Sequence, residues 1–349
     1  MGIYLFLAAV PILFSCLMHA KVRTPKKFFL ITVFTVFGTA MALRGTTVGS
    51  DTTMGKYIFS LEATRSWSQI DLTYPGWSAL CKIIGLFGGD YIILQVFASG
   101  IIVYGIARFI DVFSSNAVLS SYLFIASYTF CSALNVMRQM CAVSLVLLAI
   151  VNLYEHKKVL CILLMVAACT VHTTAIAALP ICWVFKKTTA LNYKRILGGL
   201  LIVALLLFLF YDNLVAIMTT IATHYSSYLD MDASIGGRTV YVQLFYLLFV
   251  VLGYIYGVRE SAQYKGLMII ALISICIGIM GAKNAFFLRI NYYYTIFMLC
   301  AVPNAVKKAV QDQKSELFAS VGTVLVFLIP YVIQLNANYS NVIPYRMCF

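Results

Sequence analysis

The sequence predicts an all-α integral membrane protein, and composition and the length of its apolar runs support that fold class. Of the 349 residues, 62% are hydrophobic and 11% are charged, with a mean hydropathy of +0.93. This composition is too apolar for a soluble globular domain. Unbroken apolar runs such as 197–211 and 240–258 do not fit the alternating ten-residue strands of a membrane barrel. Helices, which satisfy their own backbone groups, are therefore expected to span the lipid.

The chain offers about twelve apolar runs for a hydrocarbon core that needs about 20 residues per helix. In order, they are 3–19, 28–43, 91–107, 117–134, 136–154, 159–172, 174–185, 196–211, 240–258, 266–282, 289–304 and 317–335. The run 3–19 is followed rather than preceded by basic residues, which is the reverse of a cleavable signal. We interpret it as the first span, with the N-terminus outside. Residues 1–349 are predicted to form a single polytopic membrane domain.

Two long connections are predicted on the outer side. The first covers 44–90 and consists of a loop over 44–75 and a short apolar segment, 76–88, which contains Lys82. A run this short suits a re-entrant or interfacial helix better than a span. The second outer loop covers 212–239. Long loops on a helical scaffold are where sites are usually built, so the outer face is expected to be the working face.

Charge placement supports this topology. The net charge of +13 would suggest a nucleic-acid ligand in a soluble protein, but in a membrane protein the positions of Lys and Arg set the orientation. If 76–88 does not cross, 16 of the 25 Lys and Arg residues lie in inner loops; if it crosses, only nine do. The positive-inside rule favours the first arrangement, and no nucleic-acid partner is predicted.

Nine cations remain on the predicted outer face without a topological reason: Arg44, Lys56, Arg65, Lys82, Arg138, Arg238, Lys283, Arg289 and Arg346. An Arg at a helix end is costly unless it snorkels or meets an anion, and both alternatives stay open. Arginines on separate segments suit a polyanion, because a guanidinium can grip phosphate through two hydrogen bonds. We therefore expect an arginine-lined outer cavity that opens to the lipid and holds a diphosphate.

No metal or cofactor is predicted. The ten cysteines form no CxxC pair and have no His at ligand spacing, so we interpret them as small buried hydrophobes. The sequence Asp230-Met231-Asp232 imitates a metal-binding pair but is interpreted as ordinary loop acids. The predicted spans contain no Asp or Glu, which argues against a proton-coupled transporter.

Three stretches on the predicted outer face resemble the EpsG/Wzy-type bacterial polysaccharide polymerase family. They are Arg-Gly-Thr-Thr-Val-Gly-Ser-Asp-Thr at 44–52, Asn-Val-Met-Arg-Gln at 135–139 and Val-His-Thr-Thr-Ala at 171–175. A weaker match is Arg-Ile-Asn-Tyr-Tyr at 289–293. The chain departs from the family at Tyr74-Pro75-Gly76, where relatives commonly have Glu-Pro-Gly. No role of that Glu is carried over to Tyr74.

The resemblance implies a GT-C-like glycosyltransferase in the bacterial cytoplasmic (inner) membrane, with an active site that faces outward. Its substrates would be undecaprenyl-diphosphate-linked oligosaccharide repeat units, which it would join into capsular, exopolysaccharide or O-antigen chains. Membrane lipid, a chain-length regulator and a flippase would be its other partners. Two alternatives are an O-antigen ligase-type enzyme and a lipid-linked oligosaccharide flippase. A flippase would need polar groups through the full depth of its cavity.

The candidate site combines these motif residues. The predicted catalytic residues are Asp51, His172 and Arg138, and the predicted substrate-binding residues are Arg44, Arg289, Gln139, Asn135, Arg238 and Tyr292. Prepositioned arginines would stabilise a departing diphosphate without a metal.

The attacking sugar hydroxyl needs a base, and Asp51 and His172 are the two choices. Asp51 has a rival role as an ion-pair partner of Arg44, and His172 as a phosphate ligand or a backbone cap. Tyr225, Tyr228 and residues 292–294 would offer platforms for sugar rings or belong to an interfacial aromatic belt. Arg238, after Gly236 and Gly237, would either clamp the diphosphate or end a simple turn.

Overall fold

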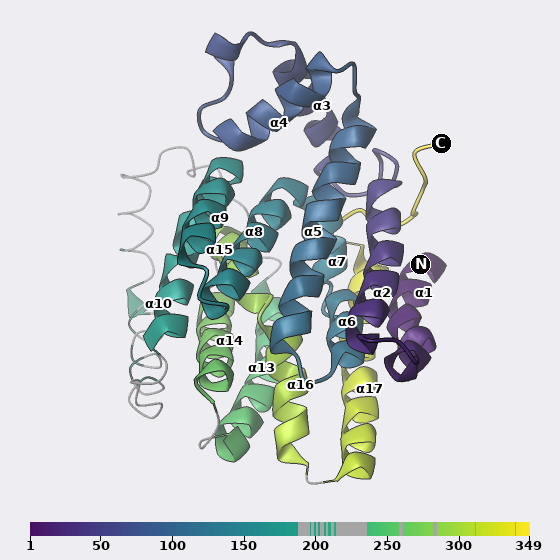
Figure 1. Ribbon diagram of the computed structural model, residues 1–349, viewed down its shortest axis with the longest axis vertical. Coiled ribbons are helices and arrows are strands. Elements are labelled where there is room, and N and C mark those ends of the chain that lie inside the picture. The colour runs from purple at the N-terminus through teal and green to yellow at the C-terminus, as the bar shows by residue number, and fades with distance from the viewer. Residues whose placement is uncertain are drawn as a thin grey trace. The chain divides into compact units, whose positions relative to one another are not determined.

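A computed structural model describes residues 1–187, 236–257, 261–281, 285–310, 312–338 and 340–349, with seven single residues between 196 and 213. In this described part all regular elements are helices (Figure 1). Extended pairing there is limited to one isolated bridge between Arg44 and Met347. The chain divides into two compact units: unit 1 is Met1–Ile176 with Phe318–Phe349, and unit 2 is Ala177–Leu317. The prediction of an all-α protein is confirmed.

Unit 1 holds most of the described helices: α1 (Gly2–Leu13), η1 (Phe14–His19), α2 (Pro25–Ala42), α3 (Thr52–Thr64), η2 (Trp67–Gln69), α4 (Pro75–Leu86), α5 (Tyr91–Phe113), α6 (Ala117–Ala126), α7 (Thr129–Asn135), α8 (Met137–Tyr154) and α9 (Lys158–Val171). Unit 2 holds α10 (Leu179–Lys187), α13 (Gly236–Gly257), α14 (Ala262–Gly281), α15 (Ala285–Thr295) and α16 (Met298–Ala309). Two elements cross the boundary between the units: η3 (Thr173–Ala178) and α17 (Gln313–Ala337).

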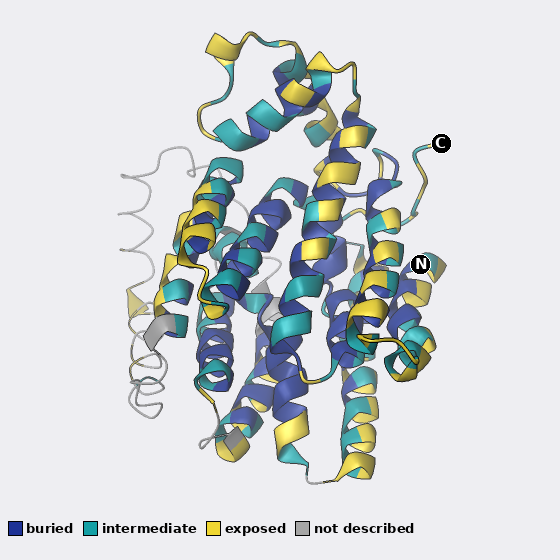
Figure 2. Ribbon diagram, in the orientation of Figure 1, coloured by how far each residue is buried: buried dark blue, intermediate teal, exposed yellow. Residues whose placement is uncertain are grey.

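Helices α5 and α8 form the centre of unit 1 and run parallel. The Cys141 thiol donates to the carbonyl of Ala98 at 3.6 Å, and the Ser144 hydroxyl donates to that of Ile102 at 3.3 Å. The two backbones approach closely at Gly105, which has no side chain. A Cβ there would lie only 2.7 Å from the Ser144 Cβ. α8 is buried along most of its length (Figure 2), as expected for a central helix. α9 follows after a tight turn and packs back along α8.

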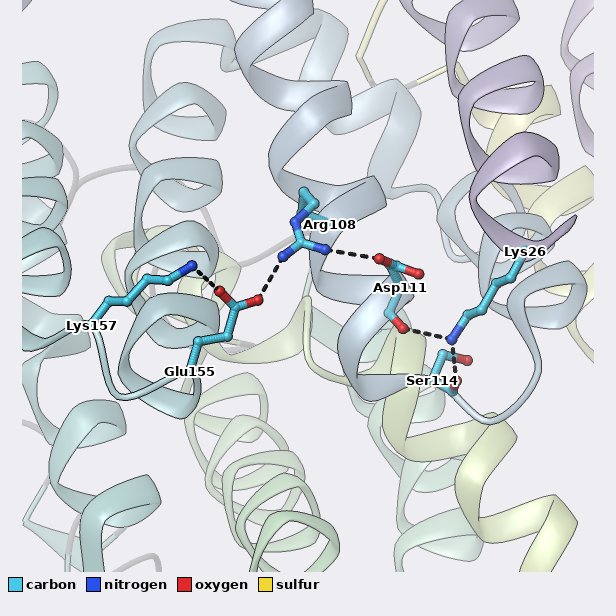
Figure 3. A network of polar contacts seen from close by, with 6 residues as sticks. All are labelled: Lys26, Arg108, Asp111, Ser114, Glu155 and Lys157. Carbon is cyan, nitrogen blue, oxygen red and sulfur yellow. Dashed lines mark hydrogen bonds and ion pairs between the residues drawn. The ribbon is translucent and has the colours of Figure 1, made fainter. Parts of the chain in front are cut away.

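This arrangement gives unit 1 two functionally different ends. The start of α8 and the end of α9 lie at one end, which we call the motif end because it carries residues 44–52, 135–139 and 172. The ends of α5 and α8 lie at the other end, which we call the network end because it carries the polar network of Lys26, Arg108, Asp111, Glu155 and Lys157 (Figure 3).

The connection predicted over 44–90 is folded into two helices. The predicted segment 76–88 corresponds to a short helix, α4, and its re-entrant or interfacial placement stays a prediction. α3 lies within the stretch 44–75 that the sequence interpretation treated as loop. α3 and α4 pack side by side at the top of Figure 1. α3 and α4 contact each other closely at Gly85, where a Cβ would lie only 2.6 Å from the Ala63 Cβ.

Five described helices are long and apolar enough to cross a membrane: Gly2–His19, Tyr91–Phe113, Met137–Tyr154, Ala262–Gly281 and Gln313–Ala337. They correspond to the predicted runs 3–19, 91–107, 136–154, 266–282 and 317–335. The predicted run 117–134 is a pair of helices, α6 and α7, bent by 53°. The bend lies at Tyr128, which adopts a left-handed conformation with φ of 65°. The structure thus supports a multi-pass membrane protein.

The remaining predicted runs are shorter or interrupted helices among the residues described. α9 and the helical stretch Thr173–Phe185 are apolar but short, and the apolar part of α13 is Val242–Tyr256. The predicted run 28–43 corresponds to α2, which begins with Pro25 and two lysines and ends at Ala42. The predicted run 289–304 is broken between α15 and α16. Most of 196–211 lies outside the described residues, so the total of twelve spans and the GT-C-like arrangement stay predictions.

Candidate functional site

The Asn-x-x-Arg-Gln stretch lies at the junction of α7 and α8. Asn135 is the last residue of α7, and Arg138 and Gln139 lie in the first turn of α8. No side chain caps the start of α8, and its first turn has no acidic residue. The helix dipole therefore presents its positive end there without compensation, which favours an anion. Gln139 is buried on α8.

Asn135 holds the loop that carries Asp51. Its side-chain oxygen accepts hydrogen bonds from the Ser50 hydroxyl at 2.8 Å and from the Asp51 backbone N–H at 2.9 Å. Gly49 makes the close approach possible, because it has φ of +97° and a Cβ there would lie 3.0 Å from the Leu134 carbonyl oxygen. Asp51 itself is exposed at the start of α3. The Asn135 side chain thus fixes the backbone of the loop at Asp51.

Arg44 is fully buried, with 0% of its surface exposed. Its guanidinium donates to the Met41 carbonyl and, at 3.3 Å, to the sulfur of Met137, the first residue of α8. Its Nε has no acceptor, and no ion pair of Arg44 is found in the described part of the chain. Burial lowers the pKa of this guanidinium. A buried charge with such weak acceptors is costly, by several kcal/mol in typical proteins.

Two expectations about Arg44 are therefore corrected. The rival interpretation of Asp51 as its ion-pair partner is wrong, because Asp51 faces outward and Arg44 contacts a carbonyl and a sulfur. Arg44 also does not line an open cavity; it lies beneath the first residue of α8. From there its charge still acts on the helix start, because a low-dielectric interior screens charge weakly.

Residues 340–348 cover this region from the other side. The Gly45 N–H donates to the Arg346 carbonyl at 2.7 Å, and the Gly49 N–H donates to the Asn341 carbonyl at 2.9 Å. The Asn338 side chain closes the turn before this segment through two hydrogen bonds to the backbone of Ile343. We call residues 340–348 the strap, because they fix the backbone on both sides of Arg44.

Arg138, Tyr74 and His172 meet at the motif end. The Cζ of Arg138 lies 3.6 Å from the centroid of the Tyr74 ring, which is a cation–π contact. The ring of His172 lies 5.5 Å from the same Tyr74 ring, at an angle of 41°. His172 follows the last residue of α9, is 3% exposed, and its Nδ1 lies 2.7 Å from the Thr174 hydroxyl. Two predicted catalytic residues are thus brought together by Tyr74.

Sequence reasoning missed a buried acid near this cluster. Glu62, on α3, has a side chain that is 4% exposed, pairs with Arg65 and accepts from the Asp71 N–H at 3.3 Å. Burial and the nearby Glu62 raise the pKa of the Cys81 thiol to about 12, and Arg138 lowers it in part. Cys81 is therefore a protonated, inert thiol. The one sequence signal for the Glu62–Arg65 pair was its spacing, since Arg65 follows Glu62 by three positions.

The remaining predicted site residues fall in unit 2 or outside the described residues. Arg289 and Tyr292 lie half-buried on α15. The side-chain oxygen of Asn291, between them, is buried and has no hydrogen-bond partner among the described residues. Arg238 lies in α13, but its side chain is outside the described part. Residues 212, 224, 225, 228, 230 and 232 also lie outside it. The prediction that Arg289 joins Arg44 and Arg138 stays a prediction.

The network end differs from the motif end in its charge pairing. Arg108 bridges the carboxylates of Asp111 at 2.8 Å and Glu155 at 2.7 Å, and Lys157 contacts Glu155 at 2.6 Å (Figure 3). Lys26 donates to the backbone carbonyls of Asp111, at 2.7 Å, and Ser114, at 2.9 Å. Lys26, Arg108 and Lys157 are all cations that the charge count assigns to inner loops. Their separation from the motif end is what that count predicts.

No group of metal-ligating side chains of three or more is found among the residues that the structure describes. The sequence model of one protein family, the EpsG family, matches residues 27–347. No curated protein and no solved structure gives a significant match to the chain.

Proposed function

Because this chain belongs to the EpsG family over 27–347, we propose that it polymerises lipid-linked repeat units at the outer face of the membrane. Family membership suggests a polysaccharide polymerase-type membrane protein. The proposed substrates are undecaprenyl-diphosphate-linked oligosaccharides, and the proposed products are capsular, exopolysaccharide or O-antigen chains. The reaction is a glycosyl transfer without a metal.

The buried, uncompensated guanidinium of Arg44 supports this proposal most strongly. It lies against Met137, so its charge adds to the positive dipole end of α8 and to Arg138 in the first turn. Three positive features therefore meet at one place. A diphosphate is a dianion or trianion that would satisfy this field, and bidentate guanidinium contacts match its oxygens.

The chemistry that this site would support follows from charge development. The hydroxyl of an acceptor sugar attacks the anomeric carbon of the donor, the bond to the diphosphate oxygen breaks, and the diphosphate carries away the electron pair. Cations fixed before the reaction stabilise that developing charge without reorganising. The acceptor proton goes to a base, and Asp51 and His172 both lie at the motif end, on the loop before α3 and after α9.

The two ends of unit 1 also support an outward-facing site. Lys26, Arg108 and Lys157 gather at the network end, which the positive-inside rule places in the cytoplasm. The motif end is then the outer end. Repeat units linked to a lipid would reach it from the outer leaflet, as a partner that is itself part of the membrane.

Two alternatives are weaker. A flippase needs polar groups through the full depth of its pathway, but α8 has no charged residue after Arg138, and α5 has none before Arg108. This distribution favours an enzyme. An O-antigen ligase would use the same chemistry with a different acceptor, so the product of the reaction decides between ligase and polymerase.

The test is polymer length in a strain whose own copy is deleted and replaced by variants. Arg138→Ala and Arg44→Ala should abolish chain growth, while the single-unit product and the level of membrane protein stay as in the wild type. Lys56→Ala, which removes an exposed cation on α3, is the matched control and should give full-length polymer. Normal chain length in both arginine variants would overturn the proposal.

A further inference from the structure

The proposed function leaves Tyr74 without a role, although the structure places it against two of the candidate catalytic residues, Arg138 and His172. Its ring lies 3.6 Å from the guanidinium carbon of Arg138 and contacts the ring of His172. It is the residue through which Arg138, on α8, and His172, after α9, are joined.

Several local features fix Tyr74 in this place. The Tyr74 N–H donates to the Asp71 carbonyl at 3.3 Å, and Pro75 starts α4 directly after it. The start of α4 approaches α9 closely at Gly76, where a Cβ would clash with the Thr170 hydroxyl oxygen. Thr170 is two residues before His172. The same close approach therefore sets Tyr74 against His172.

We propose that Tyr74 is a positioning residue that orients the Arg138 guanidinium for the diphosphate. This inference rests on the proposed function. Stacking occupies the flat face of the guanidinium. The N–H donors point outward in the plane of the group, so the ring does not block their hydrogen bonds. An aromatic ring at this position thus fixes the plane of the guanidinium while engaging no donor.

The choice of an aromatic ring also preserves charge. A carboxylate at position 74 would pair with Arg138 and neutralise the cation that the leaving group needs. A tyrosine ring attracts the same cation through its quadrupole but carries no charge of its own. Tyr74 would therefore hold Arg138 in place without adding a negative charge next to it, as suits a cation that stabilises a departing diphosphate.

The experiment measures binding of inorganic pyrophosphate to the purified full chain in detergent by isothermal titration calorimetry. Tyr74→Leu removes the ring and should weaken binding about fivefold, the effect of a partly exposed cation–π contact. Tyr74→Phe keeps the ring and should restore most of that loss. Tyr57→Leu, which changes an exposed tyrosine on α3, is the matched control and should bind as the wild type.

A double variant separates positioning from a general structural role. In an Arg138→Ala background, Tyr74→Leu should cause no further loss, because its effect passes through Arg138. If Tyr74→Leu does not fold, Tyr74→Met gives the same test. Provided that Arg138→Ala binds pyrophosphate weakly, either of two results would overturn the inference. One is wild-type binding by Tyr74→Leu, and the other is an additive loss of binding in the double variant. Unchanged binding by Arg138→Ala itself would instead remove the proposed function.

Discussion

The two ends of unit 1 treat their arginines in opposite ways. At the network end, Arg108 contacts two carboxylates, and Glu155 is shared with Lys157. At the motif end, Arg44 is completely buried, yet within the described residues its guanidinium hydrogen-bonds only to a backbone carbonyl and a sulfur. The same type of residue is compensated by the chain at one end and left uncompensated at the other.

This difference distinguishes structural from functional charge. Removing one partner of a paired cluster leaves other charges unpaired and is destabilising, whereas replacing an isolated buried charge with an apolar side chain is often neutral or stabilising. A protein that keeps an uncompensated charge gives up stability, and that pattern is expected where function requires it. The motif end therefore carries the charge that an external anion completes.

The largest expected effect is on Arg44. Arg44→Met should lower chain growth at least about tenfold, because a nearby charge in a low-dielectric site contributes more than 1 kcal/mol to the stabilisation of a developing anion. Its melting temperature should equal or exceed that of the wild type, because the apolar side chain relieves a buried charge. Polymer length and thermal unfolding in detergent measure both quantities. A large drop in melting temperature with normal polymer would show that Arg44 is structural.

Arg108→Met should show the reverse pattern. It leaves Asp111 and Glu155 without their shared cation, so the free energy of unfolding should fall by about 2 kcal/mol for this partly exposed cluster. Chain growth per folded molecule should stay normal. Denaturant unfolding with the same polymer assay tests this, and an unchanged stability would erase the contrast between the two ends.

Asn135→Ala sharpens the comparison within the motif end. Two hydrogen bonds to the loop at Ser50 and Asp51 are lost, which should lower the free energy of unfolding by about 1–2 kcal/mol. Chain growth should fall about tenfold, since a displaced catalytic loop weakens the reaction without removing a reacting group. Ser50→Ala removes one of the two bonds and should fall between Asn135→Ala and the wild type. Equal polymer length in Asn135→Ala and the wild type would exclude a positioning role.

The smallest effect concerns pH at the network end. Hydrogen bonding from Lys157, with the charges of Lys157 and Arg108, lowers the pKa of Glu155. A lowered pKa in the folded state adds stability above the unfolded value, about 4.3, and that stability is lost as pH falls through the lowered pKa. Glu155→Gln should therefore be less stable by about 1 kcal/mol or less at pH 7, and this difference should shrink as the pH is lowered below the unfolded value. A difference that is constant with pH would contradict this account.

The sequence predicts a helix correctly where an apolar run is long enough, by itself, to indicate a membrane span. α5, α8, α14 and α17 are of this kind. α3 was missed because its 13 residues mix polar and apolar side chains, a pattern that a surface loop also shows. The break at Tyr128 was missed because tyrosine gives no signal for a left-handed conformation.

The candidate site was predictable as a set of motifs but not as an arrangement. Asn135, Arg138 and His172 were identified because their stretches, 135–139 and 171–175, resemble motifs of the family. Their partners were not, because the Tyr74 ring and the Arg138 guanidinium are 64 positions apart and stacking leaves no spacing rule. The burial of Arg44 depends on the strap, nearly 300 residues away, and burial of a charge is the reverse of what polarity predicts.

The most direct test of an uncompensated charge at the motif end is a pair of pyrophosphate titrations by calorimetry. Arg44→Met and Arg108→Met each remove one buried or half-buried guanidinium from opposite ends of unit 1. Arg108→Met should bind pyrophosphate with the wild-type Kd, and Arg44→Met should bind at least about tenfold more weakly, because a nearby charge in a low-dielectric site contributes more than 1 kcal/mol. Equal Kd values for the two variants would contradict the account.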